Sequence, residues 1–72
     1  MTTDERSATS VGADFPHQLD RAREILTHYE SIPQGAFGAV FIRADIAEAE
    51  RAFASGDMVA IIRAYAKLKE IK

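Results

Sequence analysis

Four side chains near the start of the chain could act as metal ligands or as acid and base groups. His17, Asp20, Glu24 and His28 are separated by three, four and four positions, which places them on one face of a helix. Imidazoles and carboxylates are groups that divalent transition metals bind. However, one straight helix cannot wrap four ligands around a single ion, and this face points away from the apolar face of the same segment. We therefore interpret it as a solvated charged face with helix-spaced ion pairs, and we predict no metal site.

Two serines and two tyrosines are the other candidates for covalent or acid–base chemistry. Ser31 and Ser55 stand where helices are expected to end, and serine is common there because its hydroxyl bonds to nearby backbone groups. Tyr29 and Tyr65 fall on apolar helix faces, where a tyrosine usually joins the core and keeps its hydroxyl at the surface. A chain this short is also unable to enclose and dry a catalytic pocket by itself. The sequence predicts no catalytic residue, no cofactor and no enzyme.

The junction at residues 34–38, QGAFG, could instead bind a ligand through its backbone. Free amides at the start of a helix attract phosphate or carboxylate groups. No Lys or Thr completes a phosphate-binding loop here, and turn geometry with close packing explains the two glycines equally well. A nucleotide or another small anion therefore stays as an alternative ligand, with a contact set of Gln34, Gly35, Gly38, Arg43 and Arg63.

The composition describes one small globular domain that needs further stabilisation. The 72 residues are 47% hydrophobic and 28% charged, which is ordinary for a folded chain. A domain of this size buries only about 60% of its unfolded surface. Cysteine is absent, which excludes disulfides, thiolate metal sites and thiol nucleophiles. We therefore expect a second copy of the chain to supply the missing stability.

Charge and hydropathy restrict the partners and the location. The net charge of −2 argues against broad nucleic-acid binding, although a locally basic C-terminal helix with Arg63, Lys67, Lys69 and Lys72 keeps a nucleic-acid-binding role as a poorer alternative. The first fourteen residues lack the basic and apolar pattern of a secretion signal, and no run of about 18 apolar residues suggests a membrane span. We expect a cytoplasmic protein that does not contact membranes.

Helix start and stop signals divide the chain into a tail and three helices. Residues 1–13 are polar and small and predict a flexible, disordered tail, so the folded domain is expected to span residues 14–72. Asp14 and Pro16 predict a first helix over about residues 16–30. Pro33 and Gly35 predict a turn. A second helix over about 36–54 ends at Gly56, and Asp57 caps a third over about 58–71.

Apolar spacing predicts how these helices pack into an all-α, three-helix bundle. The short break between the second and third helices favours an antiparallel hairpin, and the first helix is expected to pack across it. The first helix carries an apolar face of Leu19, Ala22, Ile25, Leu26 and Tyr29. On the third helix the expected core residues are Met58, Ile61, Ile62, Tyr65 and Leu68.

The second helix has more apolar surface than a three-helix bundle can cover. One stripe, Ile42, Ile46, Ala49 and Phe53, suffices for a core. A second stripe of Phe37, Val40, Phe41 and Ala44 lies nearly opposite, and Glu48 and Arg51 continue it with charge. Three explanations stay open: cover by the first helix and the Ile32-Pro33 loop, an interface with a second copy, or a site for another partner. The predicted interface residues are Ile32, Phe37, Val40, Phe41 and Ala44.

A pattern over about residues 29–71 resembles small bacteriophage-encoded accessory proteins of unassigned function. It is carried by Tyr29, Ile32-Pro33, Gly35, Phe37-Gly38, Ile42, Ser55-Gly56-Asp57, Ala64-Tyr65 and Leu68-Lys69. The resemblance implies a non-enzymatic viral protein that binds and inhibits a host macromolecule in the host cytoplasm, such as a defence component, as an anti-CRISPR does. The main alternative is a homo-oligomer that sequesters a nucleotide signal. The expected partners are a second copy of the chain and a host protein.

Overall fold

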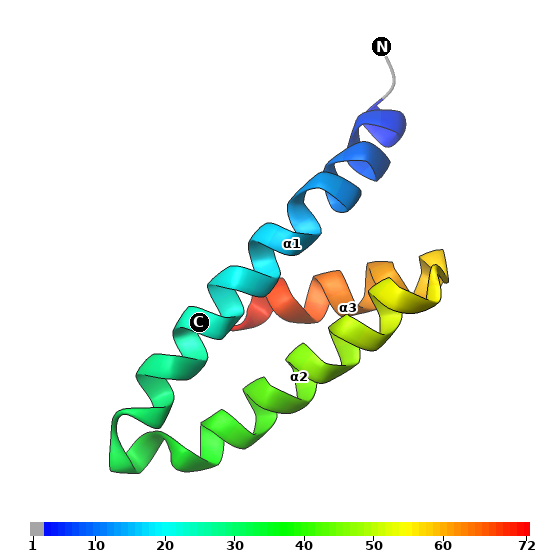
Figure 1. Cartoon of the computed structure of the whole chain (residues 1–72). Coiled ribbons are helices and arrows are strands. Elements are labelled where there is room, and N and C mark those ends of the chain that lie inside the picture. The colour runs from blue at the N-terminus through cyan, green and yellow to red at the C-terminus, as the bar shows by residue number, and fades with distance from the viewer. Residues whose placement is uncertain (1–2) are drawn as a thin grey trace.

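The computed structural model describes the backbone of residues 3–72 and the side chains of residues 11–72. Three α-helices follow one another, α1 (Thr3–Glu30), α2 (Ala36–Ser55) and α3 (Met58–Glu70), with a single 3-10 turn η1 (Pro33–Gly35) between the first two. Figure 1 shows α1 and α2 spreading apart from this turn, with α3 between them. The described residues contain no strand, so the prediction of an all-α, three-helix bundle is confirmed.

Local sequence signals place the two connections as expected. Pro33 opens η1, and the amide of Gly35 donates to the carbonyl of Ile32 at 2.9 Å. At the other end, Gly56 takes a left-handed conformation with φ of 74° and ends α2. The Asp57 carboxylate accepts the amides of Val59 at 3.0 Å and Ala60 at 3.4 Å. Glycine and aspartate are the preferred residue types at these two positions.

The start of α1 differs from the sequence prediction. The helix begins at Thr3, and Pro16 lies inside it instead of in its first turn. Pro16 has no amide to donate to the carbonyl four residues earlier, but burial of Phe15 and packing of Val11 against the core hold this part of α1 in place. The predicted tail, residues 1–13, includes Met1 and Thr2, which lie outside the described residues, and side chains before Val11 that are not described. The backbone of residues 3–13 is thus helical, and the flexibility predicted for residues 1–13 stays a prediction.

The core runs along the line where the three helices meet. Phe15 and Leu68 are its largest fully buried side chains. The ring of Phe15 stacks on Phe53 with 4.9 Å between centroids and lies 6.4 Å from the ring of Tyr65, so one aromatic ring joins all three helices. The buried cluster consists of Phe15, Leu19, Ala22, Ile42, Ile46, Ala49, Ala52, Ile61, Ala64, Leu68 and Ile71.

The buried face of α3 is rotated from the predicted one. Met58 and Ile62 were expected in the core, but they are 58% and 50% exposed. Ala64 and Ile71 take their places beside Ile61 and Leu68. A small residue such as Ala64 lets α3 lie close to both neighbouring helices. Phe53 also keeps 48% of its surface exposed despite its contact with Phe15.

Arg21 of α1 holds the C-terminal end of α3. Its two terminal nitrogens donate to the carbonyls of Leu68 at 2.7 Å and Ile71 at 2.8 Å, and its Nε donates to Gln18 at 2.8 Å. The last carbonyls of a helix lack partners within the helix and carry partial negative charge, so a cation there is favourable. This clamp directs the end of α3 toward the middle of α1, where Figure 1 shows the C-terminus.

Candidate functional site

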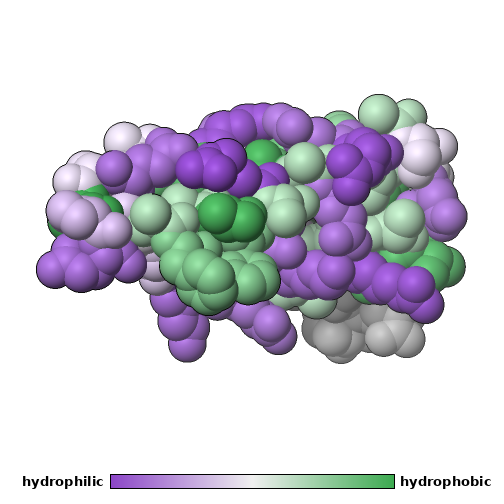
Figure 2. Space-filling model, turned by 90° about the horizontal axis from the view of Figure 1, so that it is seen from below, coloured by the Kyte–Doolittle hydropathy of each residue, from purple (hydrophilic) through white to green (hydrophobic). Residues whose placement is uncertain are grey.

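An exposed apolar surface on the N-terminal half of α2 is the most unusual feature of the molecule. Phe37 is 76% exposed and Phe41 is 58% exposed, and their rings meet edge to face with 5.2 Å between centroids. About half of each neighbouring aliphatic side chain, Ile32 and Val40, is also exposed. We call these four residues the aromatic patch. Figure 2, which views the molecule from the α2 side, shows a hydrophobic area bordered by hydrophilic residues.

The patch is exposed because α3 covers only part of α2. Lys67, near the end of α3, pairs with Glu48 at 3.0 Å, and the Arg21 clamp then draws the last turn of α3 toward α1. The antiparallel course of α3 therefore leaves the first two turns of α2 uncovered on this side. The explanation in which the first helix and the Ile32-Pro33 loop cover Phe37 and Phe41 is wrong for the single chain. Self-association and a different partner stay open.

The two glycines of the 34–38 junction serve a close helix contact. A Cβ on Gly35 would lie 2.2 Å from the carbonyl oxygen of Tyr29, and one on Gly38 would lie 2.8 Å from the ring of Tyr29. The end of α1 and the start of α2 thus meet at Tyr29, with no room for a side chain at either glycine. Close packing alone is sufficient to explain why glycine occupies both positions.

The predicted nucleotide-contact residues are spread over different parts of the molecule. Gln34 is exposed beside the buried Gly35 in η1. Arg43 pairs with Glu30 of α1 at 3.2 Å. Arg63 lies on α3 beside Glu48 and Ala52, in the C-terminal half of α2 and away from the junction. The structure thus places Arg63 away from the junction and pairs Arg43 with Glu30 at the end of α1, and nucleotide binding stays a prediction from the sequence alone.

A groove between α2 and α3 is the second surface feature of interest. It has a volume of about 280 Å³ and is lined by Glu48, Arg51, Ala52, Ala60 and Arg63. Glu48 is engaged by Lys67, whereas Arg51 and Arg63 form no ion pair with any residue whose side chain is described. The groove therefore combines alanine side chains with two exposed arginines that form no ion pair among the described side chains. Spacing indicated Arg51 only as the charged continuation of the apolar stripe.

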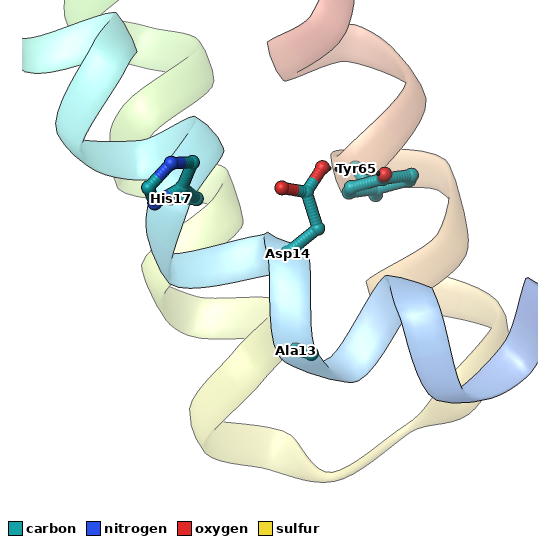
Figure 3. A pocket seen from close by; sticks show the side chains of 4 residues that line it. All are labelled: Ala13, Asp14, His17 and Tyr65. Carbon is teal, nitrogen blue, oxygen red and sulfur yellow. Dashed lines mark hydrogen bonds between the residues drawn. The ribbon is translucent and has the colours of Figure 1, made fainter.

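A third depression, of about 450 Å³, contains a hydrogen bond between a side chain of α1 and a side chain of α3. It is lined by Ala13, Asp14, His17 and Tyr65. The Tyr65 hydroxyl donates to the Asp14 carboxylate at 2.8 Å, and the amide of Gln18 donates to the same oxygen at 3.0 Å. Figure 3 shows the carboxylate directed toward Tyr65, with His17 apart from both on the α1 side. Asp14, expected to cap a helix, instead joins two helices.

The hydrogen bonds of Asp14 move two pKa values away from neutrality. Donation by Gln18 and then by Tyr65 lowers the pKa of the Asp14 carboxyl below its ordinary value. The bond to Asp14 raises the pKa of the Tyr65 hydroxyl, with burial adding to this effect. At neutral pH the carboxyl is therefore ionised and the phenol protonated. Neither group has the pKa near 7 that suits proton transfer in catalysis.

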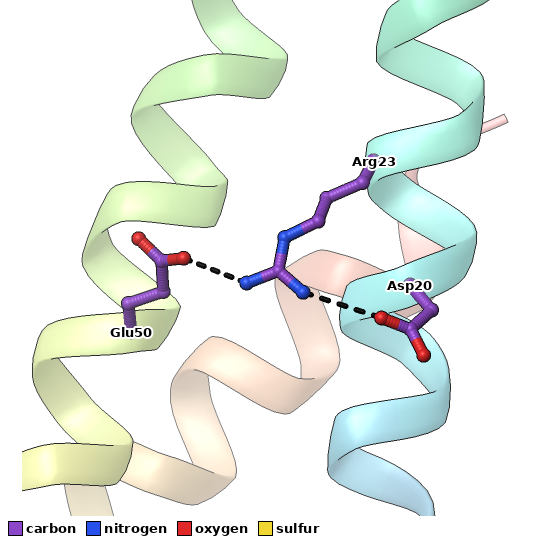
Figure 4. A network of polar contacts seen from close by, with 3 residues as sticks. All are labelled: Asp20, Arg23 and Glu50. Carbon is purple, nitrogen blue, oxygen red and sulfur yellow. Dashed lines mark hydrogen bonds and ion pairs between the residues drawn. The ribbon is translucent and has the colours of Figure 1, made fainter.

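The histidine and carboxylate face of α1 lies at the surface, as expected. Arg23 reaches from this face to Glu50 of α2 at 2.7 Å and to Asp20 at 3.2 Å (Figure 4). The bond to Glu50 raises the pKa of Arg23. Among the described residues, no three potential ligand side chains come close enough together to hold a metal ion.

Comparison with known proteins identifies no relative of this chain. The chain matches no protein-family model, no curated protein and no solved structure. Over the part of the chain that the structure describes, no helix has both the length and the apolar character required to cross a membrane. A functional proposal therefore has to rest on the surfaces described above.

Proposed function

We propose that this protein is a binding protein without catalytic activity and that the aromatic patch is its contact surface. The observation that carries the proposal is the exposure of Phe37 and Phe41. A phenylalanine side chain presents roughly 150–250 Å², so the exposed parts of these two offer about 250 Å². Ile32 and Val40 extend this area, and the largest apolar patch on a soluble protein, typically about 300–600 Å², is often functional.

The energetics support an occupied patch. Removing one phenylalanine from water contributes about 1.5–3 kcal/mol, which is a large share of the stability of a small domain. An edge-to-face pair whose geometry is already set loses little side-chain entropy when it is buried. Burial of the patch by a partner is therefore strongly favourable in free energy and costs little side-chain entropy.

The titratable groups support binding in preference to catalysis. Hydrogen bonds from Gln18 and then Tyr65 lower the pKa of Asp14, and the bond to Asp14 raises the pKa of Tyr65, so neither pKa moves toward 7. The carboxylates beside Arg23 lie at the solvated surface in ion pairs. The narrower hypothesis, a phage accessory protein that inhibits a host macromolecule in the cytoplasm, rests on the sequence resemblance. The aromatic patch is the surface that such an inhibitor would use.

Photocrosslinking in cells tests this proposal. The photoreactive residue p-benzoylphenylalanine replaces Phe37, and cells producing the protein are irradiated. We expect a discrete set of covalent adducts whose partners are identified by mass spectrometry. The matched control carries the same probe at Glu24, an exposed position on α1, and a second variant adds Phe41→Glu to the probe at position 37.

The proposal requires that adducts at position 37 exceed those at position 24 and decline with Phe41→Glu. Equal, diffuse labelling at both positions would show that the patch faces only solvent.

A further inference from the structure

The outward face of α2 differs between its two ends. Phe37, Ala44 and Arg51 are spaced by seven residues, about two helical turns, so they form one line along the helix. All three are exposed. One end of the line carries the aromatic patch, the middle carries a small residue, and the far end carries a guanidinium group without an ion pair among the described side chains.

The groove lies on the same side of this line as the second aromatic ring. Phe41 and Glu48 are also seven residues apart and therefore share a side of α2. Glu48 lines the groove and contacts α3 through Lys67. Thus α2 has a projecting aromatic pair at its N-terminal end and a groove at its C-terminal end, both on the side toward α3.

We infer that the aromatic patch binds a second copy of this chain, with the two α2 helices antiparallel and each Phe37–Phe41 pair in the groove of the other copy. This inference rests on the proposed function, because it names the partner of the same surface. A two-fold axis that passes close to Ala44 exchanges the N- and C-terminal ends of the two α2 helices. It leaves the grooves of both copies on the same side of the helix pair. Phe37 of one copy then lies opposite Arg51 of the other.

The chemistry of the groove suits an aromatic side chain. Ala52 and Ala60 provide apolar contact, and Arg51 and Arg63 line the same groove. Guanidinium groups are weakly hydrated and are attracted to the faces of aromatic rings. The charge of Glu48 is compensated by Lys67. The aromatic pair can therefore meet alanine side chains and guanidinium groups in the groove, and the pair and the groove belong to the same chain.

The two-fold arrangement also covers what the single chain leaves bare. In an antiparallel pair, α3 of one copy runs beside the N-terminal half of the other copy's α2. That half is the part that the second copy's own α3 does not reach. A stable interface buries about 600–800 Å² on each partner, or roughly an eighth of the 5121 Å² surface of this chain. The two phenylalanines offer about 250 Å² of this area, and the groove walls with Val40 and Ala44 add to it. A parallel pair would instead place the two Arg51 side chains together.

The solution mass is the first test. Light scattering should give twice the chain mass of 7.9 kDa for the wild type. Phe41→Glu and Arg51→Glu should each weaken the dimer at least tenfold, with unchanged helical circular dichroism because both positions are exposed in the single chain.

Engineered disulfides then test the geometry, because the chain has no cysteine of its own. Under mild oxidation, Ala44→Cys should form a covalent dimer. Phe37→Cys alone should not, because the two positions would lie about 21 Å apart along the helices, but a mixture of Phe37→Cys and Arg51→Cys should. Glu24→Cys on α1 is the matched control and should stay monomeric.

The outcomes separate this inference from the proposed function. A wild-type mass of one chain, with position 37 crosslinking to a different protein, overturns the dimer and leaves the binding proposal standing. A dimer in which Phe37→Cys links to itself and not to Arg51→Cys overturns the antiparallel arrangement. A monomer without adducts at position 37 overturns both.

Discussion

Asp14 illustrates how a residue's role depends on contacts that sequence spacing does not contain. An aspartate two residues before a proline is typical of a helix start, but here the helix continues past both. Its carboxylate bonds to a tyrosine 51 positions away. The lowered pKa of Asp14 and the raised pKa of Tyr65 share this bond as a cause, and this makes the stability of the α1–α3 contact depend on pH.

Replacing Tyr65 with phenylalanine tests this dependence. The contribution of Asp14 is complete above its ordinary pKa of 3.8 and is lost as the pH falls through the lowered pKa of the folded protein. The contribution of Tyr65 is complete below 10.0 and is lost as the pH rises through its raised pKa. Tyr65→Phe should therefore lower Tm by a constant amount between these limits, and the difference should shrink outside them.

Thermal unfolding followed by circular dichroism across pH measures this difference. The control is Thr27→Ala, which removes a hydroxyl bonded to the neutral carbonyl of Arg23 at 3.1 Å and should shift Tm equally at every pH. A Tyr65→Phe difference that persists unchanged to pH values well below 3.8 would contradict the role given to Asp14.

The residues that could be predicted are those with local roles. Asp57 accepts the amides of Val59 and Ala60, and Gly56 adopts the left-handed conformation that ends α2. Residue type and position were therefore sufficient to predict both roles. Arg21 was missed because its partners, Leu68 and Ile71, lie 47 and 50 positions away, and no spacing rule connects an arginine with a distant helix end.

Among the elements, α2 also shows that sequence spacing does not predict contacts between segments far apart in the chain. Its second apolar stripe was visible in the sequence, and three residues of the aromatic patch, Phe37, Val40 and Phe41, lie on it. Whether that stripe is covered depends on where α3 ends and which way it turns, and both depend on the Arg21 clamp. The face of α3 was mispredicted for a related reason: Ile61 and Ile62 are both apolar, and only the positions of the other helices decide which one is buried.

The close packing of α1 against α2 predicts how substitution of glycine changes the stability of the protein. Gly38→Ala should destabilise the protein by about 1 kcal/mol, because overpacking against Tyr29 costs about 1–3 kcal/mol and helix propensity returns about 1 kcal/mol. Gly12→Ala in α1, where a Cβ meets nothing within 4 Å, should instead stabilise it by about 0.5–1 kcal/mol.

Urea unfolding at one fixed protein concentration measures both variants. If Gly38→Ala gains as much stability as Gly12→Ala, then the close contact between Gly38 and the Tyr29 ring does not constrain the bundle.

For the molecule as a whole, the small core and the exposed aromatic patch both affect the stability of the folded chain. A 72-residue chain without cysteine has little stability to spare, and an exposed aromatic pair adds surface that association would bury. If two copies unfold together, mass action requires stability to rise with concentration.

The wild-type Tm should therefore rise by about 3–5 °C for each tenfold increase in protein concentration. Phe41→Glu should unfold at a Tm that depends less on concentration, since its negative charge opposes burial of the patch and weakens the dimer. Scanning calorimetry over a hundredfold concentration range measures both proteins. A wild-type Tm that does not move would contradict stabilisation by association.

The contacts between α1 and α3 also have a consequence for the order in which the chain folds. The turns at η1 and Gly56 join neighbouring segments, whereas the Arg21 and Asp14 contacts close loops of 47 to 51 positions. Closing a longer loop costs more entropy, although the cost rises slowly with length. We expect the two local helix pairs to form first and the α1–α3 seam to close last. The same seam, which aims the end of α3 and thereby leaves the aromatic patch bare, would be the first part of the folded protein to open.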